Sequence, residues 1–247
     1  MPVPNAAPAP GSSPRPVIDL NADLGEEITD DAGLLGVVTS ANVACGYHAG
    51  SVEIMHRVCA EAARRGVAIG AQVSYADRAA FGRTAHDVES AILREQVADQ
   101  VGVLGQIAVL EGATLSYLKP HGALYHRVLR DEVQAAAVLA GSGALPVLTL
   151  PLSALGAQAA AAGRGVFSEG FPDRAYTSEG GLVPRSEQGA VLSDEGRIVA
   201  HAIALAASVD SLCVHGDHPG AVDHALAVRR GLQDAGWTLR SCAWNAP

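Results

Sequence analysis

The first strand of the fold is predicted by the stretch Val17-Ile18-Asp19-Leu20-Asn21-Ala22-Asp23-Leu24. Because successive side chains of a strand point to opposite faces, Asp19, Asn21 and Asp23 share one face and the leucines share the other. Three polar side chains on one face of a buried parallel strand cost free energy unless they bind something. The stretch therefore predicts a buried strand with a functional polar face, although Asp19 is equally compatible with a satisfied interior carboxylate.

The same pattern of a short apolar run followed by a helical segment recurs along the chain. Further strands are predicted at residues 37–44, 67–73, 114–118, 146–149, 165–168 and 211–214. Helices are predicted at residues 51–65, 88–112, 131–140, 153–162, 193–207 and 219–235. Ser51 is predicted to cap the first of these helices, and Thr84-Ala85-His86-Asp87 resembles a capping box before the second.

Seven strand–helix alternations predict parallel strands joined by right-handed crossovers, which leaves an open doubly wound sheet or a closed barrel. A doubly wound dinucleotide-binding sheet needs a Gly-x-Gly-x-x-Gly turn after its first strand, and the sequence has none. A Gly-x-x-x-x-Gly-Lys-Ser/Thr phosphate loop is also absent from the sequence. We therefore predict an α/β fold that consists of one parallel (β/α) barrel with seven strands.

The composition disfavours several classes of protein. The formal net charge of −9 argues against a nucleic-acid partner, because phosphate backbones select basic surfaces. No apolar run reaches the roughly 18 residues that span a membrane, so no membrane association is expected. No pair of cysteines has Cys-x-x-Cys spacing, which disfavours a disulfide framework or a zinc knuckle and indicates a reducing, cytoplasmic compartment.

The first 16 residues differ in composition from the rest of the chain. They are rich in Pro, Ala and Ser, and they lack the basic head and apolar centre of a secretory signal. Such a composition is typical of a disordered segment. We therefore predict a disordered tail at residues 1–16 and a single barrel domain at residues 17–247.

Polar side chains gather where the predicted strands end. The carboxyl ends of barrel strands meet at one mouth, where barrel enzymes hold their active sites. We therefore predict an active site at this mouth. For two residues near this mouth, a structural role is an alternative to a role in the site: Asn42 is also compatible with a turn, and Asp217 with an N-cap of the last helix.

Lys119 is the only lysine in a chain whose lysine and arginine residues together number 17. It follows the fourth predicted strand and precedes His121 by two positions. A compact ammonium acts as a point charge or a proton donor in a tight pocket, which a guanidinium fork cannot do. We therefore predict that Lys119 belongs to the site. If its side chain lines a wet mouth, it is expected to matter for activity more than for folding; if it pairs a buried carboxylate such as Asp19, activity and stability should be lost together.

Six segments carry a resemblance to a known family. They are residues 21–26, 41–50, 118–125, 169–176, 182–186 and 214–217, and the longest reads Ala41-Asn42-Val43-Ala44-Cys45-Gly46-Tyr47-His48-Ala49-Gly50. In this order, from about Val17 to the C-terminus, they resemble the LamB/YcsF family. The resemblance implies a distorted (β/α)7 TIM-like barrel related to polysaccharide-deacetylase-like barrels.

The resemblance also implies a reaction. The LamB/YcsF family supplies the A subunit of bacterial 5-oxoprolinase, which opens 5-oxo-L-proline to L-glutamate with hydrolysis of ATP to ADP and phosphate. Partner subunits B and C are therefore expected, with ATP as a cosubstrate together with Mg²⁺. The lactam is a resonance-stabilised amide, so phosphorylation of its oxygen would prepare the ring carbon for attack by water.

This chemistry assigns expected roles to the residues of the mouth. Phosphoryl transfer requires positive charge near the transferred group, and attack by water requires a base and support for the oxyanion. The predicted catalytic residues are Asp23, His48, Lys119 and His121. The predicted substrate- or phosphate-binding residues are Asn21, Asn42, Gln72, Glu169, Arg174, Arg185, His215 and Asp217.

A metal site is the last question that the resemblance raises. The related deacetylase barrels bind a divalent metal through one Asp and two His, and Asp23 and His48 match two of these positions. Gln72 stands where the family usually has His, and Gln is a poor zinc ligand beside imidazole, so tight zinc is not expected. Two alternatives stay open: a stand-alone metal-dependent amidohydrolase or deacetylase, and a non-catalytic subunit that only binds the lactam.

Overall fold

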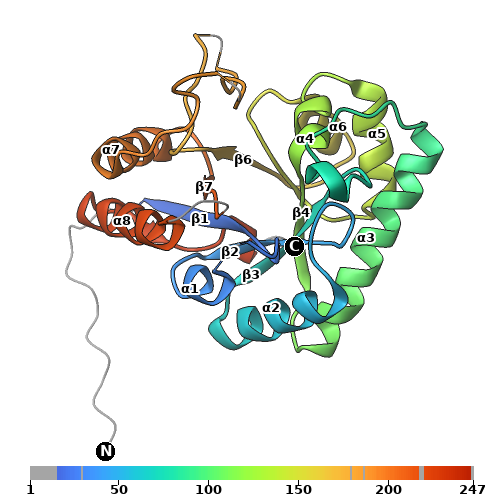
Figure 1. The fold of residues 1–247 in the computed structure, drawn as a ribbon, viewed down its shortest axis with the longest axis horizontal. Coiled ribbons are helices and arrows are strands. Elements are labelled where there is room, and N and C mark those ends of the chain that lie inside the picture. The colour runs from blue at the N-terminus through green and yellow to red at the C-terminus, as the bar shows by residue number, and fades with distance from the viewer. Residues whose placement is uncertain (1–15, 29, 179, 186, 217–219, 246–247) are drawn as a thin grey trace, which may run out of the picture.

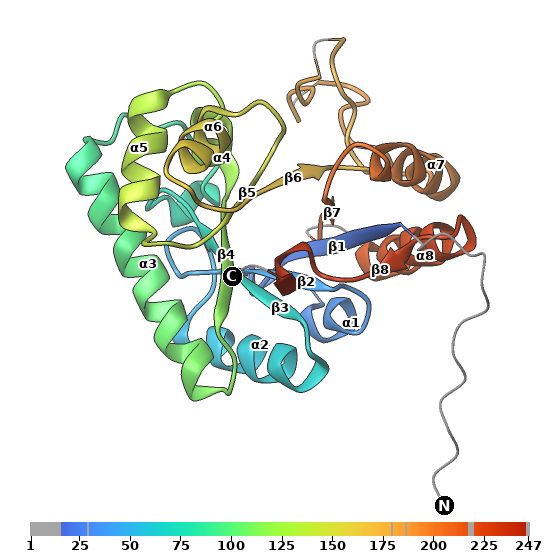
Figure 2. The same cartoon turned by 180° about the vertical axis from the view of Figure 1, so that it is seen from behind.

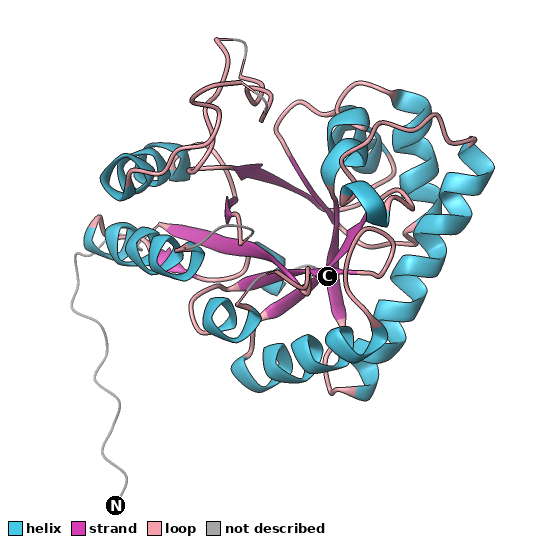
Figure 3. Cartoon of the chain, viewed as in Figure 1, coloured by secondary structure: helices cyan, strands magenta, loops and turns pink. Residues whose placement is uncertain are grey.

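Seven parallel strands form a closed barrel with helices on its outside (Figures 1 and 3). The computed structural model describes residues 16–28, 30–178, 180–185, 187–216 and 220–245. The barrel strands are β1 (Val17–Leu24), β2 (Ser40–Ala44), β3 (Ala68–Val73), β4 (Leu115–Pro120), β5 (Val147–Thr149), β6 (Val166–Gly170) and β7 (Ser211–Val214). Neighbours in the barrel follow chain order, and β1 closes it by pairing with both β2 and β7. The predicted seven-stranded barrel is confirmed.

A short eighth strand, β8 (Thr238–Leu239), is absent from the sequence prediction. It pairs in parallel with Val17 and Ile18 at the start of β1. The backbone N–H of Thr238 also donates to the carbonyl of Pro16 over 2.8 Å. This pairing ties the C-terminal segment to the end of the barrel at which the strands begin. Apart from Pro16, the tail predicted at residues 1–16 lies outside the described residues.

The helices surround the barrel, and Figure 2 shows α3, α5 and α6 on one side with α7 and α8 on the other. Their bounds are α1 (Asp31–Leu35), α2 (Val52–Arg65), α3 (Ser90–Leu110), α4 (Gly122–Arg127), α5 (Glu132–Gly141), α6 (Ala154–Ala161), α7 (Glu195–Ala206) and α8 (Ala221–Asp234). Two short 3-10 helices are η1 (Arg78–Ala80) and η2 (Cys242–Asn245). Within the described ranges, no helix combines the length and the apolar character needed to cross a bilayer.

The starts of the helices test the capping predictions. Ser51 caps α2 as predicted, because its hydroxyl accepts a hydrogen bond from the backbone N–H of Ile54 over 3.3 Å. The capping box predicted at residues 84–87 is wrong: α3 begins only at Ser90, and its N-cap Glu89 makes no side-chain cap bond. Residue 84 is held by tertiary contact instead, since its backbone N–H donates to Oδ2 of Asp77 over 3.0 Å.

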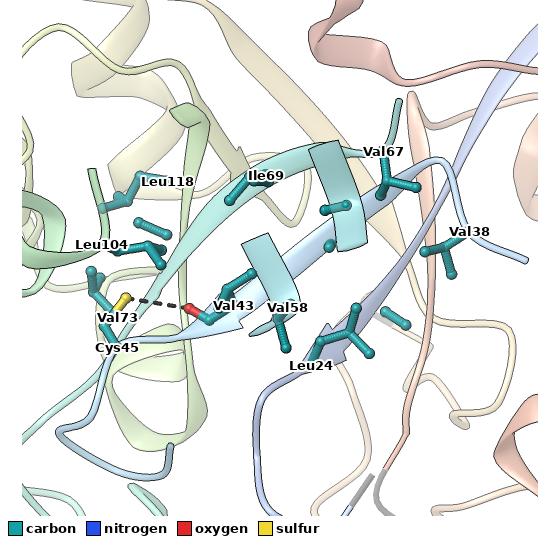
Figure 4. Packing of buried hydrophobic residues seen from close by; sticks show 14 of the residues in the cluster. Leu24, Val38, Val43, Cys45, Val58, Val67, Ile69, Val73, Leu104 and Leu118 are labelled. Atoms are coloured by element: carbon teal, nitrogen blue, oxygen red, sulfur yellow. Dashed lines mark hydrogen bonds between the residues drawn. The ribbon is translucent and has the colours of Figure 1, made fainter. Parts of the chain in front are cut away.

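Apolar side chains fill the layer between the barrel and the helices. Figure 4 shows Val43 of β2, Val58 of α2 and Leu104 of α3 within this layer. Leu20 and Leu24 of β1 belong to the same buried cluster, as the alternation in that strand predicts. Each fully buried side chain of this kind contributes roughly 1.5–3 kcal/mol. This burial holds the helices on the outer face of the strands and leaves the inner face available for polar groups.

One part of the barrel interior is apolar near the end at which the strands begin. Tyr117, Leu148 and Phe167 pack there with Ala243. Gly70 on the neighbouring strand makes room for the tyrosine, because a Cβ atom at this position would lie 2.2 Å from the ring of Tyr117. The interior toward the mouth is polar, and a polar group around Asp19, Ser40 and Ser211 extends to the end at which the strands begin.

Candidate active site

A cavity of about 360 Å³ opens at the mouth, where the strands end. Its walls come from the ends of β1, β4 and β7, from the start of α4 and from the long loop between β6 and α7. The cationic side chains that line it are those of Arg83, Lys119, Arg174 and Arg185. Ligand pockets of small molecules have this size, and the cationic lining favours an anionic molecule.

Lys119 lies at the floor of the cavity and is only 2% exposed. Its Nζ is 3.2 Å from Oδ1 of Asp23 and 3.0 Å from Oε2 of Glu169, and it donates to Sγ of Cys213 over 3.1 Å. Burial alone would lower the pKa of Lys119, but the neighbouring carboxylates outweigh burial and hold this pKa well above its usual range. Lys119 is therefore a fixed positive charge that is both buried against acids and exposed to the cavity, so the condition of a wet position is not met.

The two carboxyl groups that contact Lys119 differ in their pKa shifts. Burial raises the pKa of Asp23, but neighbouring groups, led by the ammonium of Lys119, outweigh burial and hold this pKa well below its usual range. Burial also raises the pKa of Glu169, and here the effect of burial prevails over the nearby ammonium. Asp23 receives a further hydrogen bond from Nδ2 of Asn42 over 2.8 Å. Of the two acids, Asp23 is therefore the one whose ionised form the site favours more strongly.

Asn21 and Asn42 lie beneath the cavity and do not line it. Nδ2 of Asn42 donates to Oδ1 of Asp23 and, over 2.7 Å, to Oδ1 of Asn21. The hydroxyl of Tyr117 donates to Oδ1 of Asn42 over 2.7 Å. The two asparagines, predicted to bind substrate, are thus placed to orient Asp23 from below.

Asp19 continues this polar column toward the other end of the barrel. Its carboxylate accepts hydrogen bonds from the hydroxyls of Thr39, Ser40 and Ser211, and Ser211 accepts one from Nδ2 of Asn21 over 2.7 Å. Burial raises the pKa of Asp19. Of the two readings that the sequence allows for Asp19, the structure supports the satisfied interior carboxylate.

Glu26, His48, Gln72 and His121 form a second buried cluster, which we call the histidine cluster. Nδ1 of His121 is 3.5 Å and Nε2 of His48 is 3.9 Å from Oε1 of Glu26. Nε2 of Gln72 donates to the same oxygen over 2.9 Å and lies 2.9 Å from Nδ1 of His121. The two imidazole rings stack with centroids 4.1 Å apart. Glu26 and His121 border the cavity, whereas His48 and Gln72 lie behind them.

The hydrogen bonds of His121 assign its tautomer. Nε2 lies 3.2 Å from the carbonyl oxygen of Phe81, which can only accept, so Nε2 carries the proton. Nδ1 then has a lone pair and accepts from the amide of Gln72. Burial, followed by the neighbouring His48, lowers the pKa of His121 well below its usual value. His121 is therefore a neutral imidazole with Nδ1 facing Glu26.

The histidine cluster fits a metal better than the pair expected from the sequence. Single ligand atoms of Glu26, His48 and His121 all lie within 4.8 Å of one another. Asp23, the expected partner of His48, is instead engaged by Lys119. Two imidazoles and a carboxylate are a suitable donor set for a divalent transition metal. Glu26 was not predicted as a functional residue, although it ends the first segment of the family resemblance.

His215 reaches the cavity wall from the end of β7 and is oriented by a residue outside the predicted set. Its Nδ1 is 2.8 Å from Oδ2 of Asp173, and its backbone N–H donates to the same oxygen over 3.1 Å. Burial raises the pKa of Asp173, but His215 outweighs burial and lowers it. The ring of His215 also stacks on Phe171, with centroids 5.4 Å apart. The predicted site residue Asp217 lies outside the described residues.

The loop between β6 and α7 carries the two predicted phosphate-binding arginines (Figure 1, orange). Arg174 is buried, and its guanidinium donates to the carbonyls of Ala190 over 3.1 Å and Val183 over 2.6 Å. It therefore fixes the shape of the loop as well as lining the cavity. Arg185 is exposed on the same loop and also lines the cavity, so it is the more accessible cation.

Comparisons with known proteins agree with this architecture. The chain matches the model of the LamB/YcsF family over residues 18–246. A protein of Streptomyces coelicolor, named as the A subunit of 5-oxoprolinase, is 54% identical in a match that covers 89% of this chain and 97% of that protein. The solved lactam utilization protein from Thermus thermophilus is 34% identical, with a TM-score of 0.84 over 90% of this chain and 98% of that one.

A more distant solved structure shares the fold alone. A variant of the peptidoglycan deacetylase PdaC from Bacillus subtilis has a TM-score of 0.50 and 13% identity, and the match covers 93% of this chain and 89% of that one. The expected relation to deacetylase-like barrels is confirmed at the level of the fold. The family model spans nearly the whole described barrel, and the chain therefore belongs to the LamB/YcsF family.

Proposed function

We propose that this chain is the A subunit of an ATP-dependent 5-oxoprolinase, which cleaves 5-oxo-L-proline to L-glutamate while ATP is hydrolysed to ADP and phosphate. The name of the Streptomyces coelicolor relative supports this activity. The observation that carries it in this chain is the buried ammonium of Lys119, held between Asp23 and Glu169 at the floor of a cationic cavity. A compact anionic lactam matches the size and charge of that cavity.

The proposed division of labour follows from where the side chains lie. Lys119 supplies a fixed positive charge for the lactam oxygen or for a phosphoryl group attached to it. Arg185 pairs with the substrate carboxylate or a phosphate from the accessible loop. Asp23, kept ionised by Lys119, accepts a hydrogen bond from the attacking water, and His121 borders the same wall. His48 lies behind His121, so it acts through the cluster and does not touch the substrate.

Partner subunits B and C are part of this proposal. The sequence has no dinucleotide fingerprint and no phosphate loop, which favours a contribution of the partners to the use of ATP with Mg²⁺. We therefore expect the isolated chain to release little glutamate. The cytoplasmic location stays a prediction.

The test measures glutamate released from 5-oxoproline by the chain alone and by the chain with subunits B and C, each with and without ATP. The proposal expects turnover only with the partners and ATP together. Robust ATP-independent turnover by the chain alone, lost on chelation, would instead favour a stand-alone metal-dependent amidohydrolase. The histidine cluster is the observation that keeps this second function in view. Full turnover by the partners without this chain would leave it no more than a lactam-binding role.

A further inference from the structure

We infer that the histidine cluster is an exchangeable site for a divalent transition-metal ion, in which the amide of Gln72 takes the place of the ion when the metal is absent. Nothing in the proposed lactam chemistry requires this ion, so the inference goes beyond that function. The ligands are Oε1 of Glu26, Nε2 of His48 and Nδ1 of His121. Glu26 follows β1, His48 follows β2 and His121 follows β4, and the three side chains converge beside the cavity.

The spacing of these atoms is close to that of a metal site. In a tetrahedral zinc site with bonds of about 2.0–2.1 Å, ligand atoms lie about 3.3 Å apart. Nδ1 of His121 and Nε2 of His48 are 3.5 and 3.9 Å from Oε1 of Glu26. The second distance is too long for a hydrogen bond, so the two groups face each other without bonding. Small movements of the side chains would bring all three atoms onto one ion.

The polar atoms of the cluster lack the partners that burial requires. His48 is 1% exposed, yet neither of its ring nitrogens has a hydrogen-bond partner among the described residues. Oε1 of Gln72 is likewise buried without a partner in the described part of the chain. A buried polar group without a partner costs about 1–3 kcal/mol. A metal ion would satisfy a nitrogen of His48 directly.

The charges around Glu26 also favour a bound cation. Among the described residues, the groups of potentially opposite charge within 4 Å of Glu26 are the imidazoles of His121 and His48. Lys119 is already shared between Asp23 and Glu169. Burial of a carboxyl group without a cation is costly unless it is protonated. A divalent ion would supply the positive charge that this group of buried acids lacks.

The amide of Gln72 stabilises the cluster when no ion is bound. Its Nε2 lies 2.9 Å from both Oε1 of Glu26 and Nδ1 of His121, so its two N–H bonds occupy the lone pairs that a metal would use. Rotation of the amide by half a turn would exchange Nε2 for Oε1 and offer an oxygen ligand instead. Because an entering ion must displace these hydrogen bonds, it is bound more weakly than in a preformed site. This weak binding is compatible with the expectation that tight zinc is absent.

The surroundings of His121 are those of a metal ligand. Its other ring nitrogen donates to the carbonyl of Phe81, which fixes the tautomer, so that the lone pair of Nδ1 can coordinate an ion once the amide of Gln72 is displaced. Such an outer hydrogen bond is a regular feature of metal-binding histidines. Binding at the cluster would leave Lys119 and Asp23 in their present places, since neither belongs to the ligand set.

The test uses the full chain, freed of metal with a chelator and titrated with Co²⁺, whose visible absorption reports ligation by imidazole. We expect one Co²⁺ per chain in the wild type. Glu26→Gln and His121→Ala should each weaken binding at least tenfold, and Gln72→His should strengthen it at least tenfold, where tenfold is about 1.4 kcal/mol. His56→Asn is the matched control, because His56 pairs with Glu111 away from the cluster and its loss should leave binding unchanged.

Circular dichroism establishes which variants fold. If His121→Ala does not fold, Glu26→Gln still tests the inference. The inference is overturned if the wild type shows no Co²⁺ absorption at millimolar ion, or if binding survives Glu26→Gln and His121→Ala in folded protein. It is also overturned if Gln72→His binds no more tightly than the wild type. The readout uses neither 5-oxoproline nor ATP, so its failure is distinct from failure of the proposed enzymatic function.

Discussion

The ammonium of Lys119 lies 3.2 Å from Oδ1 of Asp23, and both side chains are almost completely withdrawn from solvent. Breaking a buried ion pair by removing one partner typically costs about 3–5 kcal/mol, because the other charge is left without compensation. The pair is therefore a structural element of the barrel as well as the floor of the cavity. This double role changes what substitutions of the only lysine in the chain should do.

We predict that Lys119→Met lowers both activity and stability. Loss of a charge that stabilises the transition state should reduce kcat/KM of the complex with subunits B and C at least about a hundredfold, or roughly 3 kcal/mol. The melting temperature should also fall, because Asp23 and Glu169 lose their shared cation. Adding Glu169→Gln to Lys119→Met removes one uncompensated acid, so it should recover part of the melting temperature and none of the activity. Full activity of Lys119→Met in the complex would refute the role of this residue.

Tyr117→Phe should separate orientation of Asp23 from general stability. The substitution removes the donor to Oδ1 of Asn42, which in turn donates to Asp23. We expect a stability loss of about 1–3 kcal/mol and a severalfold fall in kcat. Tyr75→Phe is the control, because the hydroxyl of Tyr75 donates to Gln134 over 3.3 Å, outside the site. Equal effects of the two substitutions on kcat would contradict an orienting role for Tyr117.

Asp173 should contribute to the loss of stability in acid. Because its pKa is lower in the folded protein than the ordinary value of 3.8, the folded state binds fewer protons than the unfolded state as the pH falls. Its contribution is complete above that ordinary value and is lost as the pH falls through the folded pKa. Urea unfolding between pH 7 and pH values near 3 should therefore show a shallower loss for Asp173→Asn than for the wild type. Asp234→Asn, at an exposed position at the end of α8, should follow the wild-type profile.

The two arginines of the β6–α7 loop should behave differently. Arg185 lines the cavity from an exposed position, so Arg185→Ala should raise KM for 5-oxoproline or ATP with little change in the melting temperature. Arg174 also holds two backbone carbonyls of the loop, so Arg174→Ala should lower the melting temperature and kcat as well. If Arg185, and not Arg174, fixed the loop, Arg185→Ala would lower the melting temperature and Arg174→Ala would leave it nearly unchanged. Steady-state kinetics of the complex and thermal unfolding of the chain measure both quantities.

The sequence by itself determined which face of each strand is polar and at which end of the barrel the polar residues gather. The period of two in β1 places Asp19, Asn21 and Asp23 on the inner face, and parallel strands bring their carboxyl ends to one mouth. Local chemistry was also sufficient for the cap of α2, because Ser51 bonds to the turn that it precedes. These features depend on neighbours in the chain or on the direction of the strands.

Only the tertiary structure decided which polar residues meet. Asn42 lies below Asp23, while Glu26 and His121, which are far apart in the sequence, come within 3.5 Å of each other. Such distances depend on closure of the barrel, on the stagger between its strands and on the length of each side chain, none of which is encoded in a local pattern. The environment of Lys119 was unpredictable for the same reason, because the two acids that contact it, Asp23 and Glu169, lie on two other strands of the barrel.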